Sequence, residues 1–121
     1  MQTMNYIDDH LQIEAALDRV ILDENPMVLT RKEYLLLATL VANEGEIVRR
    51  QDLLQKIWGY REDIRTRTLD VHIRRLRKKL GSFGDTYIET VFGVGYRFQR
   101  YRSSASLRNV FVPFTLQHLG I

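Results

Sequence analysis

Apolar and polar residues alternate in short runs over the first thirty positions, which is typical of β-strands. The runs are separated by turn-forming residues, of which Asp23–Pro26 is the clearest group. This pattern predicts a small antiparallel sheet over residues 5–29. Its recognisable strands are Leu11–Ile13, Arg19–Leu22 and Met27–Leu29.

After residue 29 the apolar residues recur at helical spacing. Thr30 is expected to begin the first helix, because Glu33 follows it at the capping-box spacing and an apolar run comes directly after. Apolar residues cover two faces of this helix, which predicts burial between two layers. They are Tyr34, Leu37, Ala38 and Val41 on one face and Leu36 and Leu40 on the other.

Two further helices and a hairpin are expected after the first helix. The second helix covers residues 50–58, and the third runs from about Arg67 to Leu80, just before a glycine. Residues 87–98 have the pattern of a β-hairpin that turns near Gly93–Gly95.

This order of elements predicts an α+β winged helix-turn-helix fold. An N-terminal antiparallel sheet comes first, three helices follow over residues 30–80, and a C-terminal β-hairpin wing completes the domain. Ile47-Val48, between the first two helices, is short and β-like. We expect the domain to occupy residues 1–102, with residues 103–121 as a C-terminal tail of unassigned role.

Composition narrows the class of protein. The chain has 121 residues and no cysteine, which fits one domain and excludes disulfides, thiolate zinc sites and cysteine nucleophiles. No uncharged stretch approaches the ~20 apolar residues that a membrane-spanning helix needs. We therefore expect a cytoplasmic protein.

Charge is distributed unevenly, although the formal net charge is only +3. Residues 1–30 hold six acidic side chains and one basic, whereas residues 61–80 hold eight basic and three acidic. A domain with one acidic part and one strongly basic part is expected to bind a polyanion through the basic part.

The third helix has two contrasting faces. Its apolar residues form a narrow stripe that predicts a core-facing side, namely Leu69, Ile73, Leu76 and Leu80. The opposite face is cationic and consists of Arg67, Val71, Arg74 and Lys78, with Arg75 at its edge. Such a face suits the major groove of DNA, where arginine pairs with guanine and valine contacts thymine methyl groups.

Further contacts are expected from the same helix. The cations that do not read bases are expected on phosphates, where they add affinity without sequence information. Asp70 is expected to pair with Arg74 at the i,i+4 spacing and to hold that side chain in place. The simpler alternative is a solvated charged face, but this face has almost no balancing acid and a basic, aromatic hairpin follows it.

Catalytic and cofactor sites are not indicated. The histidines, His10, His72 and His118, have no metal-ligand or triad spacing, and His72 is interpreted as packed and hydrogen-bonded beside the core stripe. Gly93-Val-Gly95 lacks the third glycine and the strand-to-helix context of a dinucleotide fingerprint. We expect no enzyme activity, no cofactor and no metal.

Four segments resemble, in order and with compatible spacing, the DNA-binding effector domain of OmpR/PhoB-type response regulators. They are Leu29–Leu37 (LTRKEYLLL), Arg50–Gly59 (RQDLLQKIWG), Arg67–Leu80 (RTLDVHIRRLRKKL) and Ile88–Phe98 (IETVFGVGYRF). The resemblance covers about residues 5–100 and implies a four-stranded N-terminal sheet, three helices and a hairpin wing. It also implies sequence-specific binding to direct-repeat promoter sites as a head-to-tail dimer, and transcription control downstream of a sensor kinase.

The resemblance also implies roles for residues at matching positions. Arg75 would be the leading base-reading residue and Val71 an apolar base contact in the major groove. The DNA-backbone contacts that it implies are Arg67, Thr68, His72, Arg74 and Thr90. Lys78, Arg97 and Arg100 are expected near phosphates because of their charge. The loop Trp58–Arg65 matches the segment that contacts RNA polymerase in relatives, with Tyr60, Arg61, Glu62 and Asp63 as the contact residues.

Two departures from the family pattern matter. Phe92 stands where family members often have an arginine that enters the minor groove, so we expect this side chain to cover the apolar base of the wing instead. Family members also carry a receiver domain, for which this chain has no room, so that a sensor kinase would act only through a domain absent from it. The chain is either an excised effector domain or a short regulator without phosphorylation control.

Two other functions compete with DNA binding. A protein-interaction module would dock the winged helix on RNA polymerase or on another regulator. An RNA-binding winged helix would need exposed aromatic side chains that stack on unpaired bases, and the outward face of the third helix has none. We expect DNA binding, because the charge distribution, the helix faces and the four segments agree.

Overall fold

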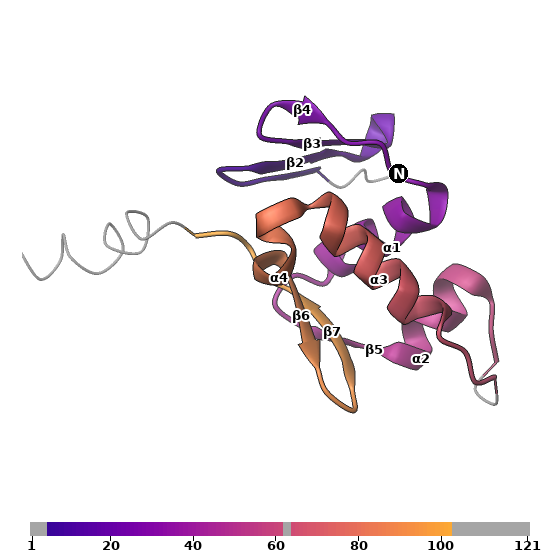
Figure 1. Ribbon diagram of the computed structural model, residues 1–121. Coiled ribbons are helices and arrows are strands. Elements are labelled where there is room, and N and C mark those ends of the chain that lie inside the picture. Colours follow the sequence, from indigo (N-terminus) through magenta and orange to yellow (C-terminus); the bar gives the residue numbers. More distant parts are fainter. Residues whose placement is uncertain (1–4, 62–63, 103–121) are drawn as a thin grey trace, which may run out of the picture.

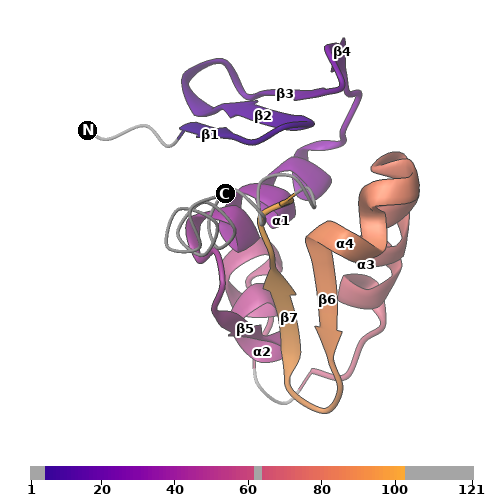
Figure 2. The ribbon, with the colours of Figure 1, turned by 90° about the vertical axis from the view of Figure 1, so that its left-hand side faces the viewer.

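A computed structural model describes residues 5–61 and 64–102. The helices lie in a central layer, with the N-terminal sheet at one end of the molecule and the hairpin wing projecting from the other (Figures 1 and 2). Among the described residues, no helix is both long and apolar enough to cross a bilayer. The predicted tail, residues 103–121, lies outside the described residues.

The N-terminal sheet has four antiparallel strands in chain order, as expected. They are β1 (Asn5–Ile7), β2 (Leu11–Glu14), β3 (Arg19–Leu22) and β4 (Asn25–Pro26). Between β2 and β3 the chain forms a 3-10 turn, Ala15–Leu17. The inward residues of this sheet are buried in the hydrophobic core: Tyr6, Leu11, Ile13 and Val20.

The predicted strand at Met27–Leu29 is wrong. The fourth strand is Asn25–Pro26, which pairs with Ile21 and Leu22. Asp23 and Glu24 have positive φ angles, 48° and 67°, so they form a two-residue hairpin turn of the type that matches strand twist. The turn is therefore limited to Asp23 and Glu24, and the last two residues of the expected turn form the strand.

The first helix, α1 (Arg31–Ala42), begins as predicted. The Thr30 hydroxyl accepts a hydrogen bond from the Glu33 N–H at 3.2 Å, and the Glu33 carboxylate accepts one from the Thr30 N–H at 2.9 Å. Both predicted apolar faces are covered, which confirms that the helix lies between layers. The buried apolar residues of α1 are Tyr34, Leu36, Leu37, Leu40 and Val41.

The second and third helices also lie where the pattern placed them. Helix α2 (Arg50–Leu53) continues as a π-helical turn, Leu54–Trp58, and the third helix is α3 (Thr68–Lys79). Two short elements after α3 were not predicted, a 3-10 turn at Gly81–Phe83 and helix α4 (Gly84–Tyr87). Tyr87 at the end of α4 is fully buried and stacks on a wing residue, Phe98, with ring centroids 5.5 Å apart.

The wing is part of a three-stranded sheet rather than an isolated hairpin. Strands β6 (Ile88–Val91) and β7 (Gly95–Phe98) form the predicted hairpin, and β5 (Ile47–Arg49) pairs with the other edge of β7. The β-like pair Ile47-Val48 thus finds its partner in a strand far along the chain. This pairing ties the start of α2 to the wing.

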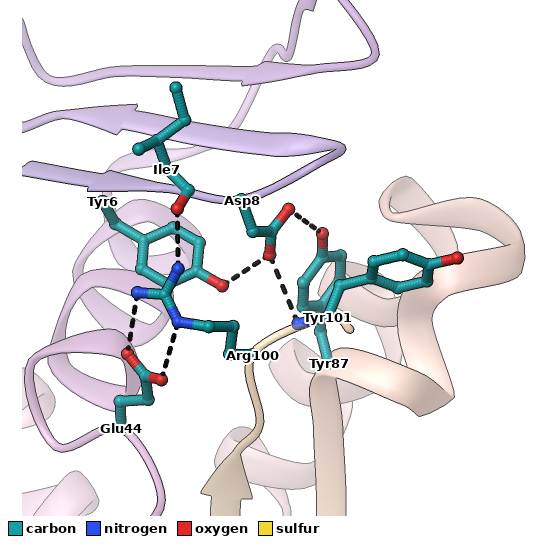
Figure 3. Close-up of polar contacts among 7 residues, drawn as sticks. All are labelled: Tyr6, Ile7, Asp8, Glu44, Tyr87, Arg100 and Tyr101. Carbon is teal, nitrogen blue, oxygen red and sulfur yellow. Dashed lines mark hydrogen bonds and ion pairs between the residues drawn. The ribbon is translucent and has the colours of Figure 1, made fainter. Parts of the chain in front are cut away.

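A carboxylate, Asp8, which follows β1, joins the N-terminal sheet to α4 and to the segment after β7 (Figure 3). It accepts hydrogen bonds from the hydroxyls of Tyr6 at 2.5 Å and Tyr87 at 2.8 Å, and from the N–H of Tyr101 at 3.3 Å. It also accepts from the backbone N–H groups of two neighbouring residues, both at 2.8 Å. Burial acts to raise the pKa of Asp8, but these hydrogen bonds outweigh it and hold the pKa below its usual range.

A second carboxylate, Glu33, joins α1 to the end of α3. Its residue is only 2% exposed, and it accepts a hydrogen bond from the Lys79 ammonium group at 2.6 Å in addition to its capping contact. Burial acts to raise the pKa of Glu33, whereas the hydrogen bonds from Lys79 and from the Thr30 N–H lower it further than burial raises it. The charged form of Glu33 is therefore the one that the fold stabilises.

Acid is expected to weaken the fold through these carboxylates. A group whose pKa is lower in the folded than in the unfolded state stabilises the fold above its unfolded pKa, about 4 for Asp and Glu, and loses this effect as the pH falls through the folded value. The free energy of unfolding should therefore fall steeply below about pH 4. Urea unfolding between pH 3 and pH 7 measures it.

In the Glu33→Gln variant this acid dependence should be shallower, because one of the shifted groups is gone. The exposed Glu46→Gln serves as the matched control and should keep the wild-type slope. An acid dependence identical in Glu33→Gln and in the wild type would show that Glu33 does not contribute.

Candidate nucleic-acid interface

Helix α3 buries one face and exposes the other, as predicted. The four stripe residues Leu69, Ile73, Leu76 and Leu80 are each at most 1% exposed. Burying four such side chains is worth roughly 1.5–3 kcal/mol each before entropy is counted, which sets the rotation of α3 about its axis. The cationic face consequently points away from the core.

The cationic face is open to solvent. Arg67, Arg74, Arg75 and Lys78 are exposed, and Val71 lies half-buried among them. Within the described part of the chain, the side chains of these four cations make no hydrogen bond or ion pair. Their donors are therefore available to an external partner.

Asp70 does not pair with Arg74, so that prediction is wrong. Its carboxylate accepts a hydrogen bond from the Arg50 guanidinium and another from the Tyr96 hydroxyl at 2.6 Å. Burial acts to raise the pKa of Asp70, but these two donors lower it below its usual range. Burial and the contact with Asp70 raise the pKa of Tyr96 to about 12. Asp70 thus fixes α3 against both α2 and β7.

A second contact fixes the wing beside α3. The Arg77 guanidinium donates to the Ile88 carbonyl at 2.6 and 3.1 Å and to the Thr90 hydroxyl oxygen at 2.8 Å. It also lies over the Tyr96 ring, 5.8 Å from its centre. Arg77 is therefore a positioning residue, and it places Thr90 next to the cationic face.

Two residues near the start of α3 that are expected to contact the DNA backbone, Thr68 and His72, lie close together. The Thr66 hydroxyl accepts from the Thr68 N–H at 3.1 Å, and the two hydroxyls are 2.7 Å apart. His72 contacts the Thr68 carbonyl through Nδ1 at 2.8 Å and packs edge-on against Trp58, with ring centroids 4.9 Å apart. The interpretation of His72 as a packed, hydrogen-bonded residue is confirmed.

The structure does not bring Arg97 to the same surface. Side chains alternate along β7, so Tyr96 points toward α3 and Arg97 points to the opposite face of the sheet. There the Arg97 guanidinium is paired with Glu89 at 2.9 and 3.1 Å. Arg100 is also occupied, by Glu44 at 3.0 and 3.3 Å and by the Ile7 carbonyl at 2.7 Å (Figure 3).

Phe92 does not cover the base of the wing, contrary to the expectation. It is 91% exposed at the turn between β6 and β7. The base of the wing is filled instead by Tyr87 and Phe98, which are fully buried.

The loop that follows Trp58 is described only in part. Tyr60 is half-buried, packs against the core, and its carbonyl accepts from the Gln51 side chain at 3.4 Å. Arg61 is exposed. The other two residues expected to contact polymerase, Glu62 and Asp63, lie outside the described residues.

The sequence reasoning gave three arginines no role beside the wing. Arg49, Arg50 and Arg65 line a hollow of about 380 Å³ between the start of α2, the segment before α3 and the wing turn. The signal that could have found two of them is the pair Arg49-Arg50 at a helix start that has no capping side chain, since cations are unfavourable there without another role.

The family comparison decides the identity of the domain. A family model described as "Transcriptional regulatory protein, C terminal" matches residues 24–98. The chain belongs to this family. The match runs from β4 to the end of β7 and so contains helices α1 to α4, the wing and the cationic face of α3.

Curated relatives of this domain are named regulators. The response regulator ArlR of Staphylococcus saprophyticus is 46% identical over 79 residues, which are 64% of this chain and 36% of that protein. The transcriptional regulatory protein YclJ of Bacillus subtilis is 48% identical over 80 residues, which are 65% of this chain and 35% of that protein. The chain therefore spans about a third of the length of these relatives.

Solved structures agree with the family. The RstA DNA-binding domain of Klebsiella pneumoniae, in complex with the RstA box, aligns with a TM-score of 0.73 and 30% identity, covering 80% of this chain and 98% of that one. The Thermotoga maritima response regulator DrrB, an OmpR/PhoB homolog, aligns with a TM-score of 0.70 and 35% identity, covering 78% of this chain and 44% of that one. The chain is thus a winged-helix effector domain of the OmpR/PhoB type, a class of DNA-binding transcription regulators and not of enzymes.

Proposed function

We propose that this domain binds double-stranded DNA sequence-specifically, with α3 in the major groove. The observation that carries the proposal is the face of α3 on which Arg67, Arg74, Arg75 and Lys78 are exposed and make no hydrogen bond or ion pair within the described chain. An α-helix fits the major groove, and unpaired guanidinium groups there can donate to guanine and to phosphates.

Within this arrangement the residues of α3 divide into two roles. Arg75 reads a base, and Val71, half-buried beside it, contacts a base through its methyl groups. Phosphates are held by Arg67, Thr68, His72, Arg74, Lys78 and Thr90. Arg97, paired with Glu89 on the far face of the wing sheet, contributes only if that ion pair opens.

We further propose that the domain acts on promoter direct repeats, as two copies arranged head to tail, in a two-component pathway. The support is that the domain is homologous to part of longer proteins named response regulators. A sensor kinase would act through another part of such a protein. The loop that includes Tyr60 and Arg61 is proposed to contact RNA polymerase.

Selection from a random double-stranded DNA pool tests the proposal. The selected duplexes are titrated with protein at several salt concentrations, because phosphate contacts make the affinity fall as salt rises. We expect a direct repeat with half-sites about one helical turn apart and a steep salt dependence. Equal, weak binding to every duplex would contradict the proposal and favour a protein-docking role, which polymerase binding through the Tyr60–Arg65 loop would then test.

The two roles proposed for arginines of α3 are separated by two substitutions. Arg75→Ala should reduce affinity for the selected site by about 1–3 kcal/mol and relax preference at one base position. Arg74→Ala should weaken binding to all DNA sequences alike and reduce the slope of affinity against salt concentration, on logarithmic scales, by about one unit. Fluorescence anisotropy with the selected duplex and single-base variants measures both.

Arg19→Ala is the matched control, because this exposed arginine of β3 is paired with Glu14 and lies at the opposite end of the molecule from the wing. It should leave affinity and base preference unchanged. Unaltered base preference in Arg75→Ala would remove that residue as the reader.

A further inference from the structure

Phe92 is the most exposed aromatic side chain among the described residues. It is 91% exposed at the turn between β6 and β7, and Val94 two residues later is 43% exposed. The turn itself does not require an aromatic residue here, since its left-handed position is occupied by Gly93, with φ +77°. The turn projects beyond the helices at the free end of the wing (Figures 1 and 2).

Hydrogen bonds hold the hairpin that carries this turn against α3. Asp70 of α3 bonds to Tyr96 of β7, and Arg77 of α3 bonds to Thr90 of β6. Between these contacts and the wing turn lies a hollow of about 260 Å³, whose lining includes Arg50, Asp70, Tyr96 and Phe92. The surface from α3 to Phe92 is therefore continuous.

Two cations lie in the hollow that adjoins the wing turn. Arg49 and Arg65 are exposed, line the adjoining hollow together with Gly93 and Val94, and make no hydrogen bond or ion pair through their side chains within the described ranges. An apolar tip with guanidinium groups in the adjoining hollow matches a ligand that is apolar in its interior and anionic at its edges. Stacked bases between two phosphate backbones have that character.

We propose that Phe92 is an apolar wedge that enters the minor groove next to the α3 site and partly unstacks one base step, while Arg49 and Arg65 in the adjoining hollow hold phosphates beside it. This inference rests on the proposed function. With α3 in the major groove, a hairpin fixed beside that helix meets the phosphate backbone and then the neighbouring minor groove. Apolar side chains that enter this groove can open and kink a step.

Such a wedge changes how the flanking sequence is recognised. A phenylalanine ring donates no hydrogen bond to a base edge, so it selects steps by how easily they open. Pyrimidine–purine steps such as TA deform most readily and should be preferred at that position. The specificity of the wing would thus be a property of DNA deformability and not of base-edge contacts.

The test uses the selected duplex with 2-aminopurine placed at successive flanking positions, because its fluorescence rises when stacking is lost. Wild-type protein should raise the fluorescence at one step only. Phe92→Ala should abolish that rise and weaken binding about tenfold, within the range for one lost stacking contact, with the salt slope unchanged. Phe92→Arg should also abolish the rise but should tighten binding to A/T-rich flanks and steepen the salt slope.

Val28→Ala is the matched control, since Val28 is 87% exposed but follows β4 at the other end of the molecule. It should alter neither affinity nor fluorescence.

Unchanged fluorescence on binding of the wild type to its selected site would overturn the wedge while leaving the proposed function intact. A loss of affinity in Phe92→Ala confined to two-copy sites, without a fluorescence change, would overturn it as well and assign Phe92 to a contact between copies. Absence of salt-sensitive DNA binding by the wild type would instead overturn the proposed function itself.

Discussion

Replacing Gly95 with alanine is expected to destabilise the domain by about 3 kcal/mol or more, at the upper end of overpacking effects. Gly95 begins β7 and lies opposite Arg49 of β5. A Cβ atom at this position would lie 2.0 Å from the Val48 carbonyl oxygen and 2.9 Å from the Arg49 Cα. Both atoms belong to the backbone of a paired strand, so relief requires β5 to separate from β7. Thermal and urea unfolding of the variant measure the loss.

Gly93→Ala is the matched control for Gly95→Ala, because it lies in the same hairpin but has open space around its Cα. Apart from Gly93 and its two chain neighbours, no atom lies within 4 Å of a Cβ built there, and only the φ angle of +77° is unfavourable. A left-handed residue other than glycine costs about 1–2 kcal/mol, and asparagine tolerates this conformation better than alanine. Gly93→Asn should therefore recover part of the loss. A Gly95→Ala variant no less stable than Gly93→Ala would show that β5 yields easily.

Removing the carboxylate of Asp8 should be the second large effect, about 3 kcal/mol, because it leaves several buried donors without an acceptor. The hydroxyls of Tyr6 and Tyr87 and the N–H of Tyr101 all donate to this group. These donors come from β1, from α4 and from the segment after β7, so Asp8→Ala should loosen the N-terminal sheet from the rest of the fold. Hydrogen exchange should show faster opening of β1 and β2, and urea unfolding should show the loss.

Two control variants separate this effect from a general loss of charge. Asp9→Ala removes the neighbouring, exposed carboxylate and should change stability by no more than about 0.5 kcal/mol. Tyr87→Phe removes one donor, while the Asp8 carboxylate keeps its other hydrogen bonds. This variant should lose about 1 kcal/mol of stability. If Asp8→Ala were as mild as Asp9→Ala, the carboxylate would not hold the N-terminal sheet to α4 and to the segment after β7.

The features that the sequence predicted correctly depend on residues close in the chain. The capping box of α1 needs only Thr30 and Glu33, three positions apart, and the helix geometry brings them together wherever the helix lies. The buried stripe and the cationic face of α3 follow from a period of 3.6 residues. The wing turn needs only the glycine at position 93, which adopts a positive φ.

The features that were missed depend on partners far along the chain. Asp70 was expected to pair four residues away, but its donors, Arg50 and Tyr96, are 20 and 26 residues away. The i,i+4 spacing does place Arg74 near Asp70, but that pair would have to order a long exposed side chain. The two donors that bind the carboxylate instead are held in place by α2 and β7. The pairing of β5 with β7 and the contacts of Asp8 have the same origin.

The wing shows most clearly which features local sequence determines and which depend on distant partners. The sequence alone determined that a glycine turn joins two strands and that basic and aromatic residues lie around it, because turn chemistry and composition are local properties. Which of those side chains face α3, which are already paired and which are exposed was decided only by the tertiary structure. Arg97 is paired with Glu89 and Phe92 is exposed because the buried partners Tyr87, Tyr96 and Phe98 set how the sheet packs on the helices. Burial of those large apolar surfaces outweighs the preferences of single exposed side chains, and it acts between residues that the sequence does not place side by side.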